Sequence, residues 1–275
     1  MIDLHLHTTA SDGRCTPLEV VERSSRAGLT VIAVTDHDTT AASDDVRRLA
    51  AEYGIEAVSG IEITAIADGR DVHMLGYFLD PRHAGLGRFL AAQREVRLAR
   101  LEAIGERLAA LGMPVDLEPV FARAAADRRR SVGRPLIARA MVEAGYVADT
   151  QEAFDRWLGA GCPVFVPRSG ASPEGVIEII HEAGGLASLA HPGKLRVEPR
   201  IAPLTEAGLD AIEAFHPDHD ALLVEKYILA ARELGLLVTG GSDFHGDPAH
   251  GLEPGSVTLP AAEFDRLRAR VHGRS

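Results

Sequence analysis

The first seven residues constrain the fold of this chain most strongly. Residues 2–7 read Ile-Asp-Leu-His-Leu-His, so apolar and polar side chains alternate. This period of two predicts a β-strand with one polar face. His5 and His7 are two residues apart, and on a strand both imidazoles point to the same side. Two converging imidazoles form half of a metal site, whereas the alternative is a histidine pair on a solvated edge.

Length and charge limit the classes of protein to consider. A chain of 275 residues can bury a large core, and a barrel of this size need not be two domains. No apolar run approaches the roughly 20 residues that span a bilayer, so we expect no membrane partner. The net charge of −11 argues against binding to long duplex nucleic acid. A small anionic substrate stays compatible, because metals and local arginines can reverse the sign inside a pocket.

Two further observations concern the compartment. The candidate ligands begin at residue 5, which leaves no room for a removable secretory segment. Cys15 and Cys162 are too few for a disulfide framework, so both are expected as reduced thiols. The sequence therefore predicts a cytoplasmic protein.

Strands and helices alternate over both ends of the chain. Helices are expected from Pro17 to about Gly28, at about 41–53 and from Pro173 to about Gly184. Further strands are expected at 31–34, 57–64, 71–79, 186–190, 211–215 and 236–239. With residues 2–7 they make about seven strands, most followed by a helix. Polar groups lie at the strand ends, the rim where catalysis takes place in α/β barrels.

One hairpin brings two candidate ligands together. Asp68-Gly69 predicts a tight turn between the third and fourth strands. Glu62 and His73 would then lie opposite or diagonal to each other, about 5–8 Å apart. A buried carboxylate without a partner is costly, so a shared cation is the natural compensation.

The middle of the chain has a different pattern. Residues 82–165 contain helical stretches at about 88–111, 117–126, 135–144 and 150–158, with no strand pattern. We therefore expect a barrel domain at 1–81 and 166–275, with 82–165 as a helical insertion that caps the active site. Arg134 follows a basic run and opens a helix, a position that holds phosphate well. It is a candidate anion contact, and a solvated basic face is the alternative.

The histidines carry the chemistry. Six of the twelve lie at or near strand ends and three carboxylates accompany them: His5, His7, His37, His73, His191 and His245, with Asp12, Glu62 and Asp243. So many imidazoles converging without a cation would be poorly satisfied. Imidazole and carboxylate without thiolate suit manganese, zinc or iron, with manganese expected first. Nine ligands exceed the needs of one site and fit two or three divalent ions, with Glu62 bridging.

The other polar residues near these motifs are expected to have supporting roles. Asp36 and Asp38 are interpreted as capping groups or as supports of the ligands. The remaining histidines are expected to be structural or on the surface: His83, His181, His219, His250 and His272.

These motifs resemble the PHP (polymerase and histidinol phosphatase) family. The matches run in order through His5-Leu6-His7, Asp12-Gly13, Thr35–Asp38, Gly60–Glu62, His73, Ala190–Pro192 and Gly241–His245. The resemblance implies an α/β fold, a distorted seven-stranded (β/α)7 barrel, with a trinuclear centre. It implies one ion on His5, His7, Glu62 and Asp243, a second on Glu62, His73 and His191, and a third on Asp12, His37 and His245.

The insertion and residues 215–219 (Phe-His-Pro-Asp-His) narrow the resemblance to one branch. They are similar to bacterial nucleoside 3′,5′-bisphosphate phosphatases, whose relatives trim short RNA from the 5′ end. In that branch a histidine often follows the Gly-Arg-Pro motif, where this chain has Leu136.

The expected activity is hydrolysis of phosphomonoesters of small nucleotides, and of short RNA, by a hydroxide that bridges two metals. Asp243 and His216 are the catalytic candidates. Arg134, Lys194 and His216 are candidates to hold the phosphate or to protonate the leaving group. The alternative interpretation of Lys194 is a solvated lysine, and that of His216 is a group that orients a ligand. The alternative functions are a phosphatase of a metabolite such as histidinol phosphate, or an inactive metal-binding accessory domain.

Overall fold

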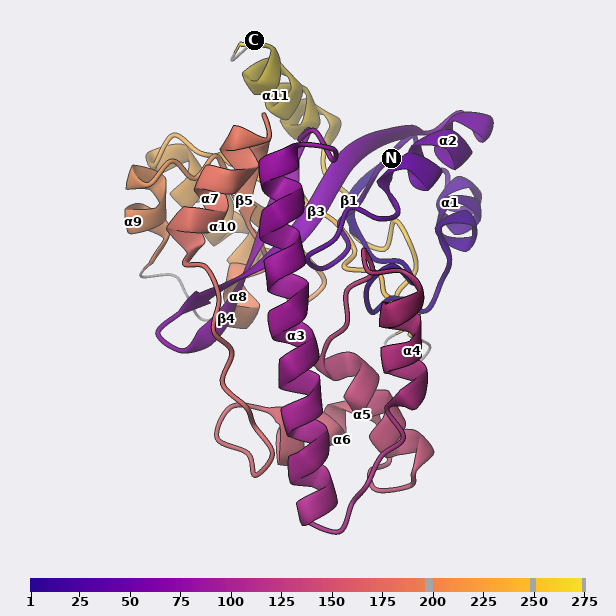
Figure 1. Cartoon of the computed structure of the whole chain (residues 1–275). Helices are drawn as coiled ribbons and strands as arrows, with labels where there is room; N and C mark the ends of the chain where they lie inside the picture. Colours follow the sequence, from indigo (N-terminus) through magenta and orange to yellow (C-terminus); the bar gives the residue numbers. More distant parts are fainter. Residues whose placement is uncertain (196–199, 248–250, 274–275) are drawn as a thin grey trace.

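A single sheet organises the molecule. The computed structural model describes residues 1–195, 200–247 and 251–273. In this part of the chain seven strands lie in sequential order. They are β1 (Ile2–Leu6), β2 (Val31–Val34), β3 (Glu56–Ala67), β4 (Arg70–Tyr77), β5 (Leu186–Leu189), β6 (Ala211–Phe215) and β7 (Leu237–Gly240). Figure 1 shows the whole chain, with β1, β3, β4 and β5 labelled.

The sheet curls until its first and last strands nearly meet. β3 pairs antiparallel with β4 and β4 with β5, whereas the other neighbouring strands are parallel. Leu6, the last residue of β1, forms a bridge with Phe244, which follows β7. The His7 N–H also donates to the Phe244 carbonyl at 2.9 Å. The two antiparallel pairings distort an otherwise parallel barrel. The distorted seven-stranded barrel expected from the sequence is confirmed.

Helices cover the outside of this barrel. One apolar cluster packs the strands against α7 (Pro173–Glu182), α9 (Ile201–Glu206), α10 (Ala221–Glu233) and α11 (Ala261–His272). A second cluster packs β1 and β2 against α1 (Pro17–Arg26) and α2 (Ser43–Glu52). The short α8 (Pro192–Leu195) follows β5. The expected start of α1 is confirmed, because Thr16 and Glu19 form a capping box.

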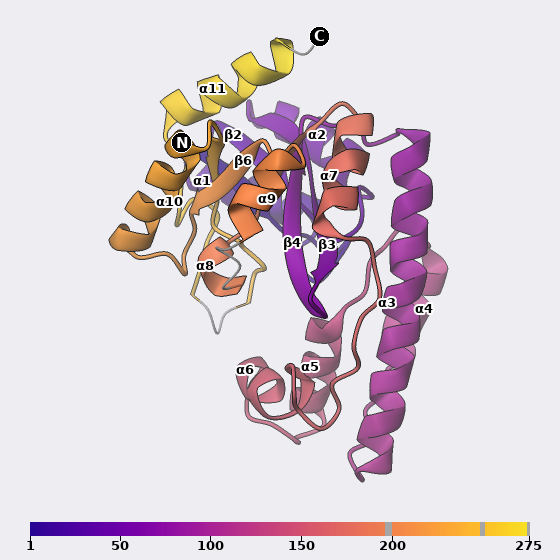
Figure 2. The same cartoon turned by 90° about the vertical axis from the view of Figure 1, so that its left-hand side faces the viewer.

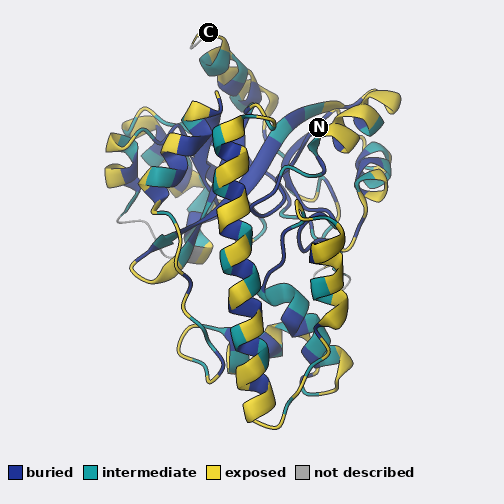
Figure 3. Ribbon diagram, in the orientation of Figure 1, coloured by how far each residue is buried: buried dark blue, intermediate teal, exposed yellow. Residues whose placement is uncertain are grey.

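Residues 82–165 form a helical body below the barrel (Figure 2). It contains α3 (Ala84–Ala110), α4 (Glu118–Ala126), α5 (Arg134–Glu143) and α6 (Thr150–Ala153), which continues as the π-helical turn η1 (Phe154–Leu158). All of these residues are described and none is in a strand. Side chains from Leu101 to Val164 form an apolar cluster of their own. Along α3, buried and exposed residues alternate (Figure 3). The start of the helix packs on the barrel, and the rest packs on the other helices of this body.

Several element bounds differ from the sequence predictions; the strand expected at 57–64, for example, spans Glu56–Ala67. The helix expected at 88–111 begins earlier, at Ala84, because His83 Nδ1 caps the Leu86 N–H at 3.3 Å. The fourth strand ends at Tyr77 rather than 79, because Phe78 has left-handed backbone (φ 60°). The helix expected at 150–158 changes to π-helix at Phe154.

No helix in the described chain combines the length and apolar character that a membrane crossing requires.

Candidate metal centre

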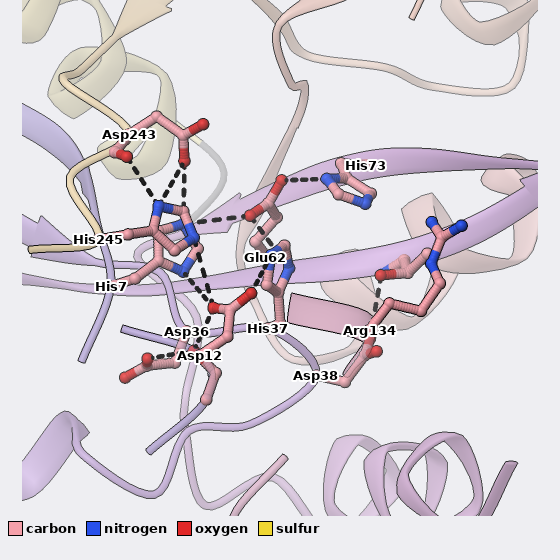
Figure 4. Close-up of polar contacts among 12 residues, drawn as sticks. His7, Asp12, Asp36, His37, Asp38, Glu62, His73, Arg134, Asp243 and His245 are labelled. Atoms are coloured by element: carbon pink, nitrogen blue, oxygen red, sulfur yellow. Dashed lines mark hydrogen bonds and ion pairs between the residues drawn. The ribbon is translucent and has the colours of Figure 1, made fainter. Parts of the chain in front are cut away.

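All nine of the expected ligands gather at one rim of the barrel. Figure 4 labels all of them except His5 and His191. Within three groups, one ligand atom per residue lies within 4.8 Å of the others. The groups are His7, Asp12, His37 and His245; His5, His7, Glu62 and Asp243; and His37, Glu62 and His73. His191 completes the set through Glu62, because its Nε2 lies 3.1 Å from Glu62 Oε1. Residues from six strands or the loops after them thus meet in one basin.

Glu62 lies at the centre of this basin. The carboxylate is fully buried and faces five imidazoles. His73 Nδ1 and His191 Nε2 lie 2.7 and 3.1 Å from Oε1, whereas His5 Nε2, His7 Nε2 and His37 Nδ1 lie 3.3, 3.3 and 3.1 Å from Oε2. The hairpin predicted that Glu62 and His73 lie opposite or diagonal to each other. They are diagonal, because the residue opposite His73 is Thr64 and the residue opposite Glu62 is Leu75. Each carboxylate oxygen therefore faces a different set of ligands, as a bridging group must.

Asp12 and Asp243 flank this centre. Asp12 lies 3.3 Å from His245 Nε2 and 3.7 Å from His37 Nε2. Asp243 Oδ1 lies 3.3 Å from the Nε2 atoms of both His5 and His7. The grouping is more connected than the three separate sets implied by the resemblance, because His7 also approaches the Asp12 group and His37 also approaches Glu62 and His73.

The residues present fit divalent cations. His7 Nδ1 and Nε2 and the Nδ1 atoms of His37, His73 and His191 are buried without a hydrogen bond. Several of them face carboxylate oxygens at short range, so the basin holds uncompensated lone pairs and negative charge. Buried polar atoms of this kind are ordinarily satisfied, and cations in the basin would satisfy those that face it.

The pKa values of the imidazoles agree with this interpretation. Burial lowers the pKa of His37 to about 3 and that of His191 to about 4, so both are neutral and able to bind a metal at neutral pH. Burial also opposes the charged form of His7, yet Asp243 and Glu62 raise its pKa to about 10. The carboxylates thus require a positive charge at this position, supplied by a proton or by a metal ion.

Glu213 supports two of the ligands and was missed by sequence reasoning. It is fully buried on β6, where Oε1 lies 2.8 Å from His5 Nδ1 and Oε2 accepts the His191 backbone N–H at 2.8 Å. This second bond fixes His191 in left-handed backbone (φ 27°). An acidic residue in the middle of an otherwise apolar strand was the available signal, because such a group is retained only with a partner.

Asp36 and Asp38 flank the candidate ligand His37 in sequence and bind other side chains, as expected for supporting groups. Asp36 accepts hydrogen bonds from the Thr8 and Ser11 hydroxyls, both at 2.6 Å. Asp38 accepts from Arg97 at 2.5 Å and from Arg168 at 2.9 Å. Burial opposes the ionised form of Asp38, but the two guanidinium groups lower its pKa to about 2. Sequence reasoning did not identify either arginine.

The expected substrate contacts line a cavity of about 570 Å³, called here the main cavity. Arg134 donates to Asp71 at 2.9 Å and lies 5.6 Å from the centre of the Phe154 ring. Lys194 Nζ is half exposed and lies 3.7 Å from Asp243 Oδ2.

His216 also lines the main cavity and has a defined tautomer. Its Nδ1 accepts the Asp218 backbone N–H at 3.1 Å, so the proton of the neutral ring is on Nε2. That nitrogen is 3.3 Å from Asp243 Oδ2. His216 therefore reaches both the cavity and a candidate ligand.

The main cavity has two unlike walls. The barrel contributes the candidate ligands, whereas the helical body contributes cationic and apolar side chains: Arg97, Arg100, Leu101, Arg134, Pro135, Arg139 and Phe154. Leu136 lies elsewhere, in a smaller cavity described below. A ligand in the main cavity would therefore contact the metal basin on one side and arginines with an aromatic ring on the other.

Of the remaining histidines, His219 is buried and joins β6 to α8, with Nδ1 at 2.9 Å from the Ala214 carbonyl and Nε2 accepting the Gly193 N–H. His181 pairs with Asp210 at 2.7 Å, and His272 lies 2.7 Å from the Arg268 carbonyl. His250 lies outside the described residues.

Comparison with known proteins identifies the family. A family model described as PHP domain matches residues 3–123. A relative from Haemophilus influenzae, named 5′-3′ exoribonuclease, is 37% identical over 250 residues, which cover 88% of this chain and 89% of the relative. The chain therefore belongs to the PHP family, and with it to the metal-dependent hydrolases of phosphoester bonds.

Two further proteins resemble it over most of their length. A protein from Chromobacterium violaceum, named 3′,5′-nucleoside bisphosphate phosphatase, is 33% identical over 259 residues, covering 92% of this chain and 90% of that protein. A crystal structure from Bifidobacterium adolescentis, provisionally described as a metal-dependent phosphoesterase, has a TM-score of 0.88 at 32% identity. It matches 98% of this chain and 96% of its own. The resemblance stated from the motifs is confirmed.

Proposed function

We propose that the protein hydrolyses phosphomonoesters of small nucleotides, of the nucleoside 3′,5′-bisphosphate type, and acts from the 5′ end on short RNA. The observation that carries the proposal is the pair of unlike walls in the main cavity. A metal basin faces the ester, and arginines beside Phe154 face the rest of the ligand. Guanidinium groups recognise phosphate, and an aromatic ring stacks on a nucleobase.

We assign the metal ions to nine residues: His5, His7, Asp12, His37, Glu62, His73, His191, Asp243 and His245. The convergence on Glu62 supports two or three ions, because two groups of ligands share that carboxylate. Manganese is the first candidate, with zinc or iron as alternatives, because all donors are imidazole or carboxylate. When bound, these ions supply Lewis-acid activation of water and neutralise charge on the phosphoryl oxygens.

The side chains around the basin perform the remaining steps. Arg134 binds a phosphate oxygen from the helical body, and Lys194 does so from α8. His216 carries its proton on Nε2, the nitrogen that faces Asp243, and stabilises the leaving oxygen at that edge of the cavity by donating a hydrogen bond. The neutral ring keeps this proton, and the leaving oxygen takes its proton from water. Asp243 orients His216 and binds metal, so it serves both parts of the site.

We further propose that residues 82–165 act as a cap on the barrel formed by 1–81 and 166–275. The separate apolar cluster of the helical body and its contribution of one cavity wall support this division. Closing over the ligand excludes water that would otherwise screen the charges. Four arginines of the cap line the cavity, so the cap binds the ligand as well as covering it.

The test measures phosphate release by the manganese-loaded protein. The substrates are nucleoside 3′,5′-bisphosphates, 5′-phosphorylated short RNA and histidinol phosphate. We expect turnover of the nucleotides and a much lower rate with histidinol phosphate, which lacks a nucleobase to contact Phe154. A preference for histidinol phosphate would replace the nucleotide proposal, and no turnover of any substrate after metal loading would favour an accessory metal-binding domain.

Two variants test the assigned ligands. Asp12→Asn and His37→Gln should each lower kcat more than about a hundredfold with an unchanged fold, because each removes a donor from the basin. Asp44→Asn and His272→Gln are matched controls at exposed positions and should keep full activity. A fully active Asp12→Asn protein would contradict the assignment of that residue to the metal centre.

A further inference from the structure

A second cavity, of about 200 Å³, lies between the helical body and the loop after β1. Thr9 and Ser11 line it from the loop, and α4, α5 and the segment between these helices line it from the other side. Three arginines reach it: Arg123, Arg130 and Arg139. This cavity plays no part in the function proposed above.

The three guanidinium groups are concentrated, and their hydrogen bonds go to neutral carbonyl oxygens. Arg123 and Arg130 both donate to the Thr9 carbonyl oxygen, at 3.4 and 2.9 Å, and Arg139 donates to the Asp12 carbonyl oxygen. Within the described ranges, none of the three forms an ion pair with a carboxylate. Two like charges that converge on one neutral oxygen repel each other, and a bound anion would relieve that repulsion.

The acidic residues of the second cavity do not neutralise it. Asp116 and Glu143 line its rim and are exposed to solvent. Asp116 uses Oδ1 to accept the Glu118 backbone N–H at 3.0 Å. Arg123 is exposed as well, whereas Arg130 and Arg139 are partly buried, so these two arginines dominate the charge deeper in the cavity.

Ser131 supplies an independent indication of a ligand. It lines the second cavity, only 2% of its surface is exposed, and its hydroxyl is without a hydrogen-bond partner in the described structure. Its backbone N–H is used, since it donates to the Ala10 carbonyl at 2.9 Å. An orphaned buried hydroxyl is costly, and a ligand oxygen would satisfy it once the neighbouring side chains shift to admit one.

Arg139 connects this cavity to the main one. Its side chain lines both cavities, and it contacts the backbone of Asp12, a candidate metal ligand. A single flexible ligand can therefore occupy the metal basin with one phosphate and pass Arg139 with the next part of its backbone.

We propose that the second cavity binds an internal phosphodiester phosphate of a single-stranded oligonucleotide whose 5′-terminal phosphate occupies the main cavity. The proposal rests on the nucleotide hydrolysis proposed above and extends it to the part of the substrate that is not cleaved. Mononucleotides are too short to use this site. The second cavity would thus make binding depend on chain length without reading base sequence.

The experiment measures binding, so that it does not depend on turnover. The probe is a 5′-phosphorylated RNA trinucleotide with a 3′ fluorescent label and hydrolysis-resistant phosphorothioate linkages, bound to the manganese-loaded protein and followed by anisotropy. Arg123→Gln and Arg130→Gln should each weaken binding about tenfold, because each removes a charge-assisted hydrogen bond to phosphate. Each should also make the plot of log association constant against log salt concentration shallower by about 0.7, since one phosphate contact is lost. Ser131→Ala should weaken binding less than either.

Controls separate the second cavity from general basic charge. Arg128→Gln changes the same charge on the same loop, but Arg128 is exposed and pairs with Glu95 at 3.2 Å, so trinucleotide binding should not change. The affinity for a nucleoside 5′-monophosphate should be equal in all of these proteins. A neutral methylphosphonate at one of the two linkages should weaken wild-type binding about tenfold and have no further effect in Arg130→Gln.

Three results would overturn the inference: unchanged trinucleotide affinity in Arg123→Gln and Arg130→Gln, equal weakening of the monophosphate, or no effect of either methylphosphonate. The last result would assign the arginines to free phosphate rather than to a nucleic-acid backbone. Failure of the proposed function is a different outcome, since wild-type protein would then release no phosphate from any substrate while the binding comparison still gives an answer.

Discussion

Single side chains behind the metal basin decide how well it is formed. Glu213 contacts His5 and His191 from the side away from the cavity, and Asp38 anchors two arginines that face it. Neither carboxylate belongs to the nine proposed ligands. Each can therefore be changed without removing a proposed donor to the metal.

Glu213→Gln should weaken metal binding about 10–100-fold, because His5 loses the charged partner that fixes its ring and raises its basicity. Metal titration of the purified protein measures this directly. Glu233→Gln, an exposed change on α10, is the control and should bind metal normally. Wild-type affinity in Glu213→Gln would show that β6 has no role in orienting the ligands.

Asp38→Asn should lower the free energy of unfolding by about 3–5 kcal/mol, because Arg97 and Arg168 would remain buried without their counter-charge. Urea denaturation gives the difference. Asp44→Asn on α2 is the comparison, since Asp44 is exposed and its ion pair with Arg47 is at the surface. Equal loss in both variants would argue against a buried charge cluster at Asp38.

The convergence of the nine proposed ligands could be predicted from sequence because they lie in short motifs on strands or in the loops that follow them. His5 and His7 share a strand face, and Glu62 and His73 are linked by a turn whose position is readable. Glu213, Arg97 and Arg168 could not be assigned, because their partners are 22 to 208 residues away and only the folded chain brings them together. Long-range pairs leave no periodic pattern in the sequence.

At the scale of elements, the junction of β1 with the segment after β7 closes the barrel. Gly241 is in direct contact with β1, and a Cβ atom there would lie 2.3 Å from the His5 nitrogen and 2.6 Å from Asp3 Oδ1. Asp3 accepts the Ser242 backbone N–H at 3.0 Å, which joins β1 to the segment after β7. It also accepts the Gly255 N–H at 2.8 Å, from the loop before α11. The close approach places Asp243 beside His5 and His7.

Gly241→Ala should therefore lower both the melting temperature and the metal affinity, because the two segments must separate to admit the methyl group. Gly87→Ala on α3 is the matched control. A Cβ atom at Gly87 would meet nothing within 4 Å, so that variant should be as stable as the parent or slightly more stable. Differential scanning calorimetry compares the two, and normal metal binding by Gly241→Ala would refute the role of this junction.

At the scale of the whole molecule, metal binding should couple to folding. The basin concentrates buried carboxylates and imidazoles that only a folded barrel brings together. Ions that bind the folded state alone stabilise it by about 2.7 kcal/mol at a concentration one hundred times Kd. Removing metal with a chelator should lower the melting temperature, and adding manganese should restore it. An equal melting temperature with and without chelator would contradict a structural contribution from the ions.

The order of elements also explains why the architecture could be predicted more fully than the cap. Alternating strands and helices have few topological solutions, and seven strands with ligands at one rim specify a barrel. The position of the helical body depends on pairs such as Arg97 with Asp38, which join residues 59 apart in sequence. Helical periodicity predicts that these helices form, but it does not predict how they are oriented on the barrel.

The main cavity is built from two bodies that each have an apolar interior, and the metal-facing residues all belong to one of them. Substitutions in the other body can therefore exchange one phosphorylated compound for another while the reacting centre stays intact. Relatives with the same catalytic chemistry and different preferred compounds would be the natural product of such independence, and grafting a foreign 82–165 segment onto this barrel is the direct way to transfer a preference.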